Sequence, residues 1–369
     1  MNPDNTLDKM NLHLHRLLFL LTAHQTVAAF ISHTTSSRHD HTTTAHLGMT
    51  KKVFIDGEAG TTGLQVRERL ASRTDLEIIS PPSDLRKDVA TRKKFINDAD
   101  AVILCLPDEA SIEAASWVEA GNDKTVLIDA STAFRVDPQW TYGFAELSKE
   151  QRNSLQKSKR ISNPGCYPTG FIGLTRPLVD AGILPEGTPL TVNAISGYSG
   201  GGKSLMQVFE SDEHEPWAGY GFGLKHKHLA EMAKYSKLGR TPIFQPQIAT
   251  FPQGMVVSVP LHYQWLKPGT KGRDIHEALG KHYAGSNFIS VMPLGEAAVK
   301  EAGLLERGAF LRPDTLKNTN KMELFVFCND ASEQAVLCAR LDNLGKGASG
   351  AAVQNLNIAL GVDETVGLL

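Results

Sequence analysis

The strongest constraint on the fold is a strand, a glycine-rich turn and a helix in direct succession. Lys52–Asp56 has the composition of a short strand, and Leu64–Leu70 has the apolar spacing of an amphipathic helix. The turn between them holds the residues that we assign to cofactor binding: Gly57, Gly60, Thr61, Thr62 and Gly63. Glycines in such a turn let the backbone approach a pyrophosphate, whose charge meets the helix N-terminus. Because the spacing is G-x-x-G-x-x-G rather than G-x-G-x-x-G, a plain strand-to-helix turn is the alternative.

Strands and helices continue to alternate after this unit. Apolar strand segments at 76–80, 100–106 and 125–128 are separated by helical segments at 91–98 and 111–120. This alternation predicts an α/β fold with a Rossmann-type parallel sheet. From about residue 182 the segments are mostly β, with strands at 189–195, 256–260, 322–328 and 334–341. They predict a second, α+β domain with an antiparallel sheet.

The end of the second strand bears on the choice of cofactor. No acid stands there to bond a ribose 2′-hydroxyl; the strand ends at Ser80, and Arg86 and Lys87 follow. Serine and basic residues suit a 2′-phosphate, so we expect NADP(H) rather than NAD. The alternative for Arg86 and Lys87 is a solvated loop.

A cysteine follows a Pro-Gly turn in the middle of the chain. Pro164 and Gly165 break the preceding segment, and Cys166 then falls near the first turn of a helix. A helix N-terminus favours thiolate over thiol, so we interpret Cys166 as a catalytic nucleophile. A small buried side chain is the alternative.

Two loops after strands offer anion-binding groups. Arg135 follows the fourth strand, where loops of parallel sheets carry ligands, and its guanidinium suits phosphate or carboxylate. The loop Ser196–Lys203 is rich in backbone donors, and we assign Ser199, Gly200 and Lys203 to substrate binding. A surface ion pair and a flexible hairpin loop are the respective alternatives.

A histidine pair supplies the candidate acid and base. His226 and His228 are two residues apart, so on a helix they would point to different sides and would not chelate a metal together. We expect the pair to offer one catalytic imidazole, with Glu231 orienting a ring or binding substrate. A structural role is the alternative.

Composition excludes several classes of function. The formal net charge is −2 over 369 residues, which gives no overall attraction to nucleic acid or to an anionic membrane. The four cysteines form no disulfide framework and no CxxC zinc pair, and Cys105, Cys328 and Cys338 lie in apolar runs. We therefore expect no metal and a reducing, cytoplasmic location.

The first 48 residues differ from the rest. They hold seven of the 13 histidines, and Asp40 is the only acid after Asp8. The apolar run Leu17–Leu21 is too short to span a bilayer. We expect residues 1–48 to be an atypical, disordered extension before a natural start at Met49; a targeting peptide is the alternative.

In combination these motifs resemble the shorter form of N-acetyl-gamma-glutamyl-phosphate reductase of arginine biosynthesis. The resemblance covers Lys51–Leu369 and rests on the following segments: 57–63, 104–108, 129–135, 163–166, 196–203, 226–228 and 343–350. Aspartate-semialdehyde dehydrogenase usually has Asn-Cys-Thr after its Asn-Pro, whereas this chain has Gly-Cys-Tyr-Pro.

The resemblance implies a domain arrangement and further site residues. It implies an NADP-binding Rossmann domain at 49–164 that is completed by 342–369, and a catalytic and oligomerisation domain at 165–341. It adds Gly347 and Ser349 to the cofactor site and makes His228 the better acid–base candidate. This fold is that of the glyceraldehyde-phosphate and semialdehyde dehydrogenase superfamily, and a homodimer or homotetramer is expected.

The implied reaction is NADPH-dependent reduction of an acyl phosphate to an aldehyde through a Cys166 thioester. The sequence does not separate acetylglutamyl phosphate from the one-carbon-longer acetylaminoadipyl phosphate, because one methylene changes only the size of a pocket. Aspartyl phosphate is a further alternative substrate. A non-catalytic dinucleotide-sensing module and a hydroxy-acid dehydrogenase are rivals of other classes, but neither needs a nucleophilic cysteine.

Overall fold

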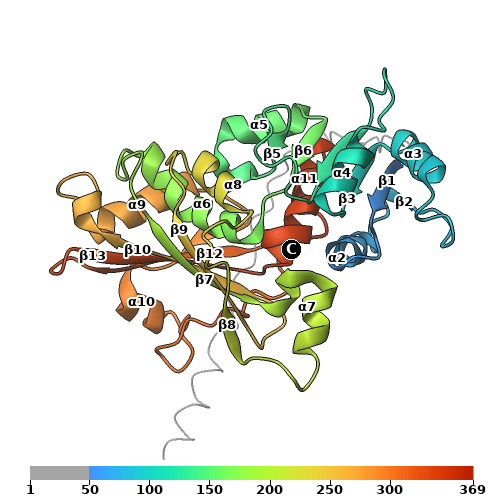
Figure 1. Ribbon diagram of the computed structural model, residues 1–369. Helices are drawn as coiled ribbons and strands as arrows, with labels where there is room; N and C mark the ends of the chain where they lie inside the picture. Colours follow the sequence, from blue (N-terminus) through green and yellow to red (C-terminus); the bar gives the residue numbers. More distant parts are fainter. Residues whose placement is uncertain (1–49, 369) are drawn as a thin grey trace, which may run out of the picture. The chain divides into compact units, whose positions relative to one another are not determined.

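The computed structural model describes residues 50–368, so the expectations for residues 1–48 lie outside the described range (Figure 1). Two β-sheets with helices packed against them make up the described part. None of its helices has the length and apolar character that crossing a membrane requires. Within residues 50–368, no cluster of His, Cys, Asp or Glu side chains is arranged to hold a metal ion.

Sheet A is a six-stranded parallel sheet with the strand order β2-β1-β3-β4-β6-β5. Its strands are β1 (Lys51–Asp56), β2 (Leu76–Ile79), β3 (Ala101–Leu104), β4 (Val126–Asp129), β5 (Thr141–Tyr142) and β6 (Arg160–Ser162). The chain passes to opposite sides of β1, and ligands bind at the carboxyl ends of strands where the order reverses in this way. The predicted Rossmann-type sheet is confirmed.

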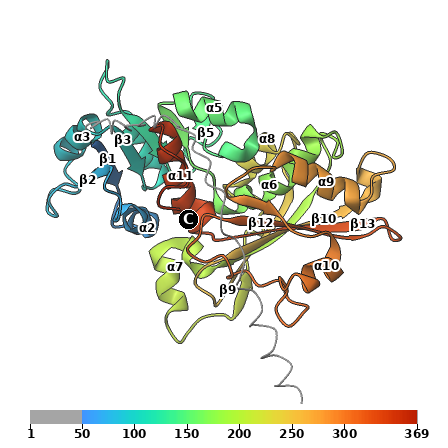
Figure 2. The same ribbon diagram turned by 180° about the vertical axis from the view of Figure 1, so that it is seen from behind.

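Helices cover both faces of sheet A (Figures 1 and 2). They are α2 (Thr61–Leu70), α3 (Val89–Asp98), α4 (Asp108–Ala115), α5 (Lys149–Lys157) and α11 (Gly350–Ala359). Val53 and Ile55 of β1 belong to the core under α2 and α11, and Phe54 belongs to the core under α3 and α4. Burial on both faces explains why these strands are continuous apolar runs in the sequence.

Sheet B has seven strands of mixed direction in the order β11-β12-β13-β10-β7-β9-β8. The strands are β7 (Thr191–Gly197), β8 (Trp217–Gly219), β9 (Ile243–Ala249), β10 (Met255–His262), β11 (Ile289–Val291), β12 (Met322–Asn329) and β13 (Gln334–Leu341). The helices of this part are α6 (Cys166–Asp180), α7 (Gly202–Phe209), α8 (Leu229–Tyr235), α9 (Gly272–His282) and α10 (Gly295–Glu301). Helices α6 and α9 lie on one face of the sheet and α10 on the other (Figure 2). The expected sheet is therefore present, although β7–β9 and β11–β12 pair in parallel.

Helix α6 lies close against sheet B because it carries glycines on the contacting face. A Cβ at Gly170 would stand 2.7 Å from Cγ2 of Val257, and one at Gly173 would stand 2.7 Å from Cε of Met322. This close packing fixes α6 and with it the residue at its first position, Cys166.

Two segments after strands fold differently from a plain loop. The expected glycine loop forms a 3-10 turn, Tyr198–Gly201, and continues directly into α7. Leu205 and Phe209, four residues apart, line the same cavity, so burying them favours the helix over an open hairpin. After β13 a π-helical turn, Gly345–Ser349, leads into α11, which contacts α2 and α5 of sheet A.

Candidate active site

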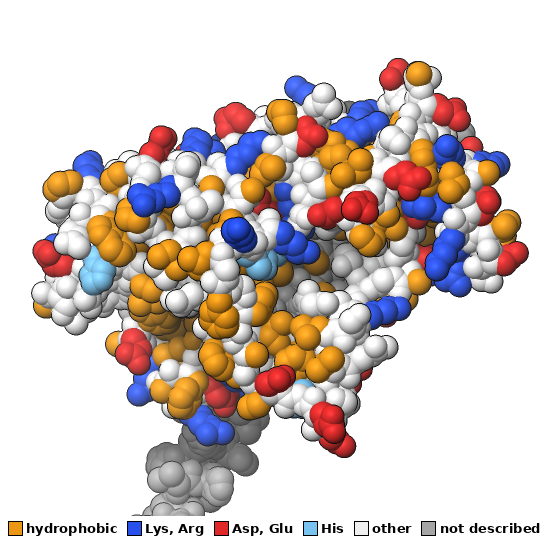
Figure 3. Space-filling model, viewed as in Figure 1, with side chains coloured by type: hydrophobic (Ala, Val, Ile, Leu, Met, Phe, Trp, Pro, Cys, Tyr) orange, Lys and Arg blue, Asp and Glu red, His pale blue; other side chains and the backbone are white. Residues whose placement is uncertain are grey.

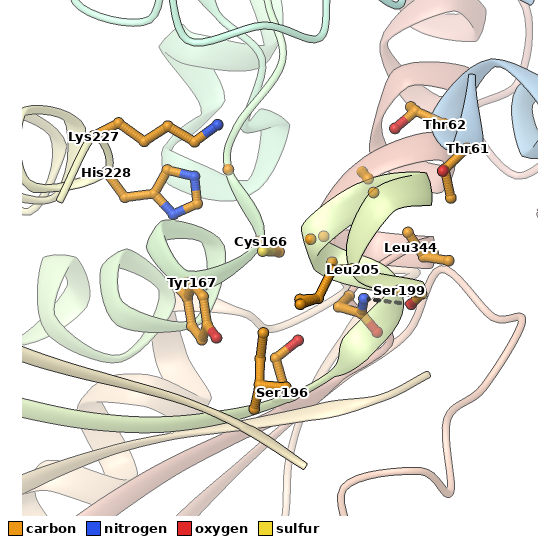
Figure 4. Close-up of a pocket in the computed structure, with 18 of the residues that line it drawn as sticks. Thr61, Thr62, Cys166, Tyr167, Ser196, Ser199, Leu205, Lys227, His228 and Leu344 are labelled. Atoms are coloured by element: carbon orange, nitrogen blue, oxygen red, sulfur yellow. Dashed lines mark hydrogen bonds between the residues drawn. The ribbon is translucent and has the colours of Figure 1, made fainter. Parts of the chain in front are cut away.

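A cavity of about 670 Å³ lies where the carboxyl ends of sheet A meet β7, α6 and α7. It brings together nine of the residues assigned from the sequence: Thr61, Thr62, Arg135, Cys166, Ser199, Gly200, His226, His228 and Gly347. In Figure 3 a histidine and cationic side chains lie beside a recess near the centre of the face. In the close-up of Figure 4, His228 and Tyr167 lie on one side of Cys166, and Thr61 and Thr62 lie on the other.

Cys166 is the first residue of α6, directly after the N-cap Gly165. Burial raises the pKa of its thiol to about 11, although Arg135 and the backbone N–H of Tyr167 act in the lowering direction. The expected depression by the helix N-terminus is thus outweighed, because desolvation disfavours the charged form. The free thiol is therefore protonated at neutral pH and needs a base when it reacts.

The two histidines lie in contact just before α8. Their ring centroids are 4.6 Å apart, and the backbone N–H of His228 donates to Nδ1 of His226 at 3.1 Å. Burial lowers the pKa of His226 to about 4 and that of His228 well below 6.5, so both rings are neutral at pH 7. Nδ1 of His228 is buried and has no hydrogen-bond partner in the described part of the chain. A neutral imidazole with a free nitrogen can accept a proton.

Glu231 and Arg135 form a buried ion pair instead of presenting two free ligands. Nη1 of Arg135 donates to Oε1 of Glu231 at 2.6 Å. Arg135 lines the cavity, but Glu231 is 1 % exposed and does not. Among the described residues no hydrogen bond joins Glu231 to either histidine, so its expected role in orienting a ring is not met.

The lysine on the cavity wall is not the one assigned from the sequence. Lys203 is exposed on α7 and lies outside the wall, whereas Lys227 lines it. Figure 4 shows the Lys227 side chain above the His228 ring. The sequence held a sign of this role, because Lys227 stands between His226 and His228, and a turn that places both histidines at one cavity also places Lys227 there. Tyr167 and Tyr220, joined through their hydroxyls at 3.2 Å, were also missed.

The glycine turn has the form that a dinucleotide needs. Gly57 has φ +87°, and a Cβ there would overlap the carbonyl of Cys105. A Cβ at Gly63 would overlap the carbonyl of Gly57, so only glycine lets α2 start this close to the turn. The N–H of Gly60 donates to the carbonyl of Gly57 at 2.9 Å. The residues present therefore fit the phosphates of a dinucleotide.

A second cavity, of about 570 Å³, adjoins this turn on the side of β2. Gly57, Arg86, Lys87 and Arg92 lie on its wall. Arg92 is paired with Asp56 at 2.9 Å, and Arg86 and Lys87 are exposed and in no ion pair of the described chain. The structure thus brings the two predicted cations beside the glycine turn.

Four assigned cofactor residues line neither cavity: Gly60 and Gly63, which shape the glycine turn, and the two serines, Ser80 and Ser349. Oγ of Ser80 donates to Glu58 at 3.0 Å and accepts from Arg67 at 2.9 Å. Ser349 is fully buried and donates to the carbonyl of Leu344 at 2.5 Å. Both hydroxyls are thus bonded within the protein, and contact of Ser80 or Ser349 with the cofactor stays a prediction.

Comparison with known proteins agrees with this arrangement. The model of the semialdehyde dehydrogenase NAD-binding domain matches residues 52–155, and that of the semialdehyde dehydrogenase dimerisation domain matches 166–343. N-acetyl-gamma-glutamyl-phosphate reductase of Trichormus variabilis is 48 % identical over 325 residues, covering 86 % of this chain and 99 % of the relative. The reductase of Rhizobium johnstonii is 50 % identical over 318 residues, covering 85 % and 99 %.

The chain belongs to the N-acetyl-gamma-glutamyl-phosphate reductase family. It is therefore an oxidoreductase, and the resemblance stated from the sequence motifs is confirmed.

Two solved structures share the fold of this chain. Aspartate semialdehyde dehydrogenase II of Vibrio cholerae, complexed with ASA, matches with a TM-score of 0.61 and 14 % identity, covering 85 % of this chain and 99 % of the other. The Candida albicans aspartate semialdehyde dehydrogenase with NADP matches with a TM-score of 0.54 and 13 % identity, covering 84 % and 98 %. At such identities the match carries the fold alone.

Proposed function

We propose that the chain reduces N-acetyl-L-glutamyl 5-phosphate to N-acetyl-L-glutamate 5-semialdehyde with NADPH and releases phosphate, as a step of arginine biosynthesis. The observation that carries the proposal is a single cavity wall shared by Cys166, the neutral His228 and the start of the glycine-turn helix. The relatives' name, N-acetyl-gamma-glutamyl-phosphate reductase, supports the substrate.

Cys166 and His228 carry the covalent step. The thiol loses its proton to the neutral imidazole as sulfur attacks the acyl carbon. The C–S bond forms, the bond from carbon to the phosphate oxygen breaks, and phosphate leaves. The product is a thioester on Cys166, and His228 holds the proton as imidazolium.

The glycine turn Gly57–Gly63 would hold the phosphates of NADPH, and the bound cofactor would supply the hydride for the thioester carbon. His228 then returns its proton to the carbonyl oxygen. Collapse of the resulting hemithioacetal transfers that proton back to sulfur and frees the aldehyde. Cys166 and His228 thus regain their starting protonation states.

We assign binding of the negatively charged leaving phosphate to Lys227. This lysine lines the cavity and takes part in no ion pair of the described chain. Arg135, which we expected in this role, already donates to Glu231, to the carbonyl of Asn163 at 3.0 Å and to that of Ala130 at 3.3 Å. Its three nitrogens are thus engaged by the protein.

NADP(H) specificity is part of the proposal. Arg86 and Lys87 offer charge to a 2′-phosphate beside the glycine turn. The match of residues 52–155 to an NAD-binding domain supports a nicotinamide dinucleotide cofactor.

We further infer a homodimer or homotetramer in a reducing, cytoplasmic compartment. The match of residues 166–343 to a dimerisation domain supports the oligomer. A reducing compartment is supported by the chemistry, since the nucleophilic thiol has to remain free, and by the four free cysteines of the described chain.

The test is a steady-state assay in the reverse direction: NADP reduction with aldehyde plus phosphate. N-acetylglutamate semialdehyde should give the highest kcat/KM, against its homologue longer by one methylene and against aspartate semialdehyde. Cys166→Ser should bind NADP normally and lose turnover by several orders of magnitude. A preference for another aldehyde would reassign the substrate, and substantial activity of Cys166→Ser would overturn the thioester mechanism.

A further inference from the structure

The carboxylate of Glu231 binds the backbone immediately before the nucleophile Cys166. Oε2 accepts from the backbone N–H of Gly165 at 3.1 Å and from the hydroxyl of Tyr142 at 2.8 Å. Oε1 accepts from Arg135 at 2.6 Å. Because these three donors come from the protein, the carboxylate is satisfied without a ligand.

Arg135 extends the same attachment to the ends of two strands. Its Nε donates to the carbonyl of Asn163, after β6, and its Nη2 donates to that of Ala130, after β4. The hydroxyl of Tyr235 in turn donates to the carbonyl of Arg135 at 2.7 Å. One ion pair therefore ties the carboxyl ends of sheet A to α8.

Gly165 makes this attachment possible. A Cβ on Gly165 would stand 2.5 Å from Nη1 of Arg135, 2.8 Å from Oε1 of Glu231 and 2.8 Å from Nε2 of His228. Three functional groups thus reach the backbone immediately before Cys166, where a side chain would push them away.

Stability alone does not explain a buried ion pair at this point. Well-packed apolar residues of similar volume often replace such a pair without loss of stability. The value of this pair lies in what it holds: the N-cap of α6, whose next residue is Cys166.

We propose that Glu231 is a positioning residue: it fixes Gly165 and Arg135, and through them Cys166, and it does not contact the substrate. The proposal rests on the reductase function above as far as turnover is concerned. It replaces the assignment of Glu231 to substrate binding made from the sequence.

Two variants separate the charge of Glu231 from its reach. Glu231→Gln keeps the shape of the side chain but has only one acceptor oxygen, so it cannot accept from both Arg135 and Gly165 as the two carboxylate oxygens do. Glu231→Asp keeps the charge and shortens the side chain. Both should lower kcat at least about thirtyfold and leave KM for the aldehyde and for phosphate within about threefold, because misplacement of a reacting group costs rate. Tyr142→Phe, which removes one donor and leaves no charge unpaired, should lower kcat less and in the same pattern.

Alkylation of Cys166 by iodoacetamide gives a readout that needs no substrate. The negative charge of Glu231 raises the thiol pKa while Arg135 lowers it. Glu231→Gln should therefore speed alkylation at pH 8 even though kcat falls, and Glu231→Asp should leave the alkylation rate near that of the wild type. If the wild type shows no reductase turnover, the proposed function fails, and these alkylation rates still test the coupling of Glu231 to Cys166.

Glu323→Gln is the matched control, since Glu323 pairs with the buried Arg340 at 2.6 Å within sheet B. It should lower thermal stability and leave kcat and the alkylation rate unchanged. A rise in KM with kcat retained in Glu231→Gln would overturn the proposal by making Glu231 a substrate ligand. Unchanged kcat in both Glu231 variants would overturn it by making the ion pair merely structural.

Discussion

Gly347 lies directly against Cys166: a Cβ at position 347 would stand 2.7 Å from Cβ and 3.1 Å from Cα of the cysteine. The π-helical turn Gly345–Ser349 thus supports the nucleophile from the side of sheet A. π-helical turns often occur at functional sites, and here the turn brings backbone without a side chain to the thiol.

Gly347→Ala should therefore displace Cys166. A shift of about 1 Å can lower turnover roughly a hundredfold, so we expect a loss of that size in kcat. Gly280→Ala is the control, because a Cβ on this exposed glycine of α9 meets nothing within 4 Å. It should be fully active and slightly more stable. Full activity of Gly347→Ala would contradict the contact.

The rate at which Cys166 reacts with an alkylating reagent should depend on pH in the way expected of a buried thiol with a raised pKa. Its pKa of about 11 lies above the usual value, so the thiolate fraction grows about tenfold for each pH unit below 11. The rate of inactivation of the free enzyme by iodoacetamide should rise accordingly between pH 7 and 10. A plateau beginning near pH 7 would instead indicate a preformed thiolate–imidazolium pair.

His228→Asn should lower kcat by about 10²–10⁴-fold, the usual contribution of general acid–base catalysis. His226→Asn should have a much smaller effect, because the amide oxygen of Asn can accept the hydrogen bond that the backbone N–H of His228 donates to Nδ1 of His226. The pKa of each histidine is lower in the folded chain than unfolded, so the unfolded state binds more protons below pH 6.5. Thermal stability should thus fall as pH drops through that range, and less so in either variant. A larger kcat loss in His226→Asn would reverse the two roles.

Lys227→Met should raise KM for phosphate in the reverse reaction at least about tenfold, which corresponds to one charge-assisted hydrogen bond. Lys203→Met is the matched control, because Lys203 is equally charged but lies outside the cavity wall. It should leave that constant unchanged. A rise for Arg135→Lys but not for Lys227→Met would return phosphate binding to Arg135.

Arg86→Ala combined with Lys87→Ala should lower the preference for NADPH over NADH. One lost charge-assisted contact is worth roughly 1.5–3 kcal/mol, which is at least a tenfold change in the ratio of kcat/KM values. Lys157→Ala combined with Lys159→Ala, both exposed outside the cavity wall, is the control. A wild-type ratio near one would refute the assignment of NADP(H). A high ratio that survives the double change would move recognition elsewhere on the wall.

Local sequence patterns predicted much of the fold. The glycine turn and the helix start at Cys166 were readable because φ, capping and strand burial are set by neighbouring residues. The direction of the Cys166 pKa was wrong for the opposite reason. It depends on burial under segments distant in sequence, which a local helix-start argument does not include.

The same limit applies to the polar network. Tyr142 and Glu231 are 89 residues apart, and nothing near either one in the sequence indicates that they meet. Ser349 shows the converse case: the family resemblance assigned it to the cofactor site, while its hydroxyl donates to the carbonyl of Leu344. Such contacts follow from how the sheets are joined, which composition and periodicity do not encode.

The core beneath β1 contains residues from both ends of the described chain. Val53 and Ile55 share one buried cluster with Val353, Leu356 and the penultimate residue, Leu368. A nascent chain that has emerged only as far as β6 therefore lacks one wall of its dinucleotide-binding sheet. Stable closure of sheet A therefore has to wait until α11 has been synthesised, so its apolar face stays uncovered while all the strands of sheet B are translated.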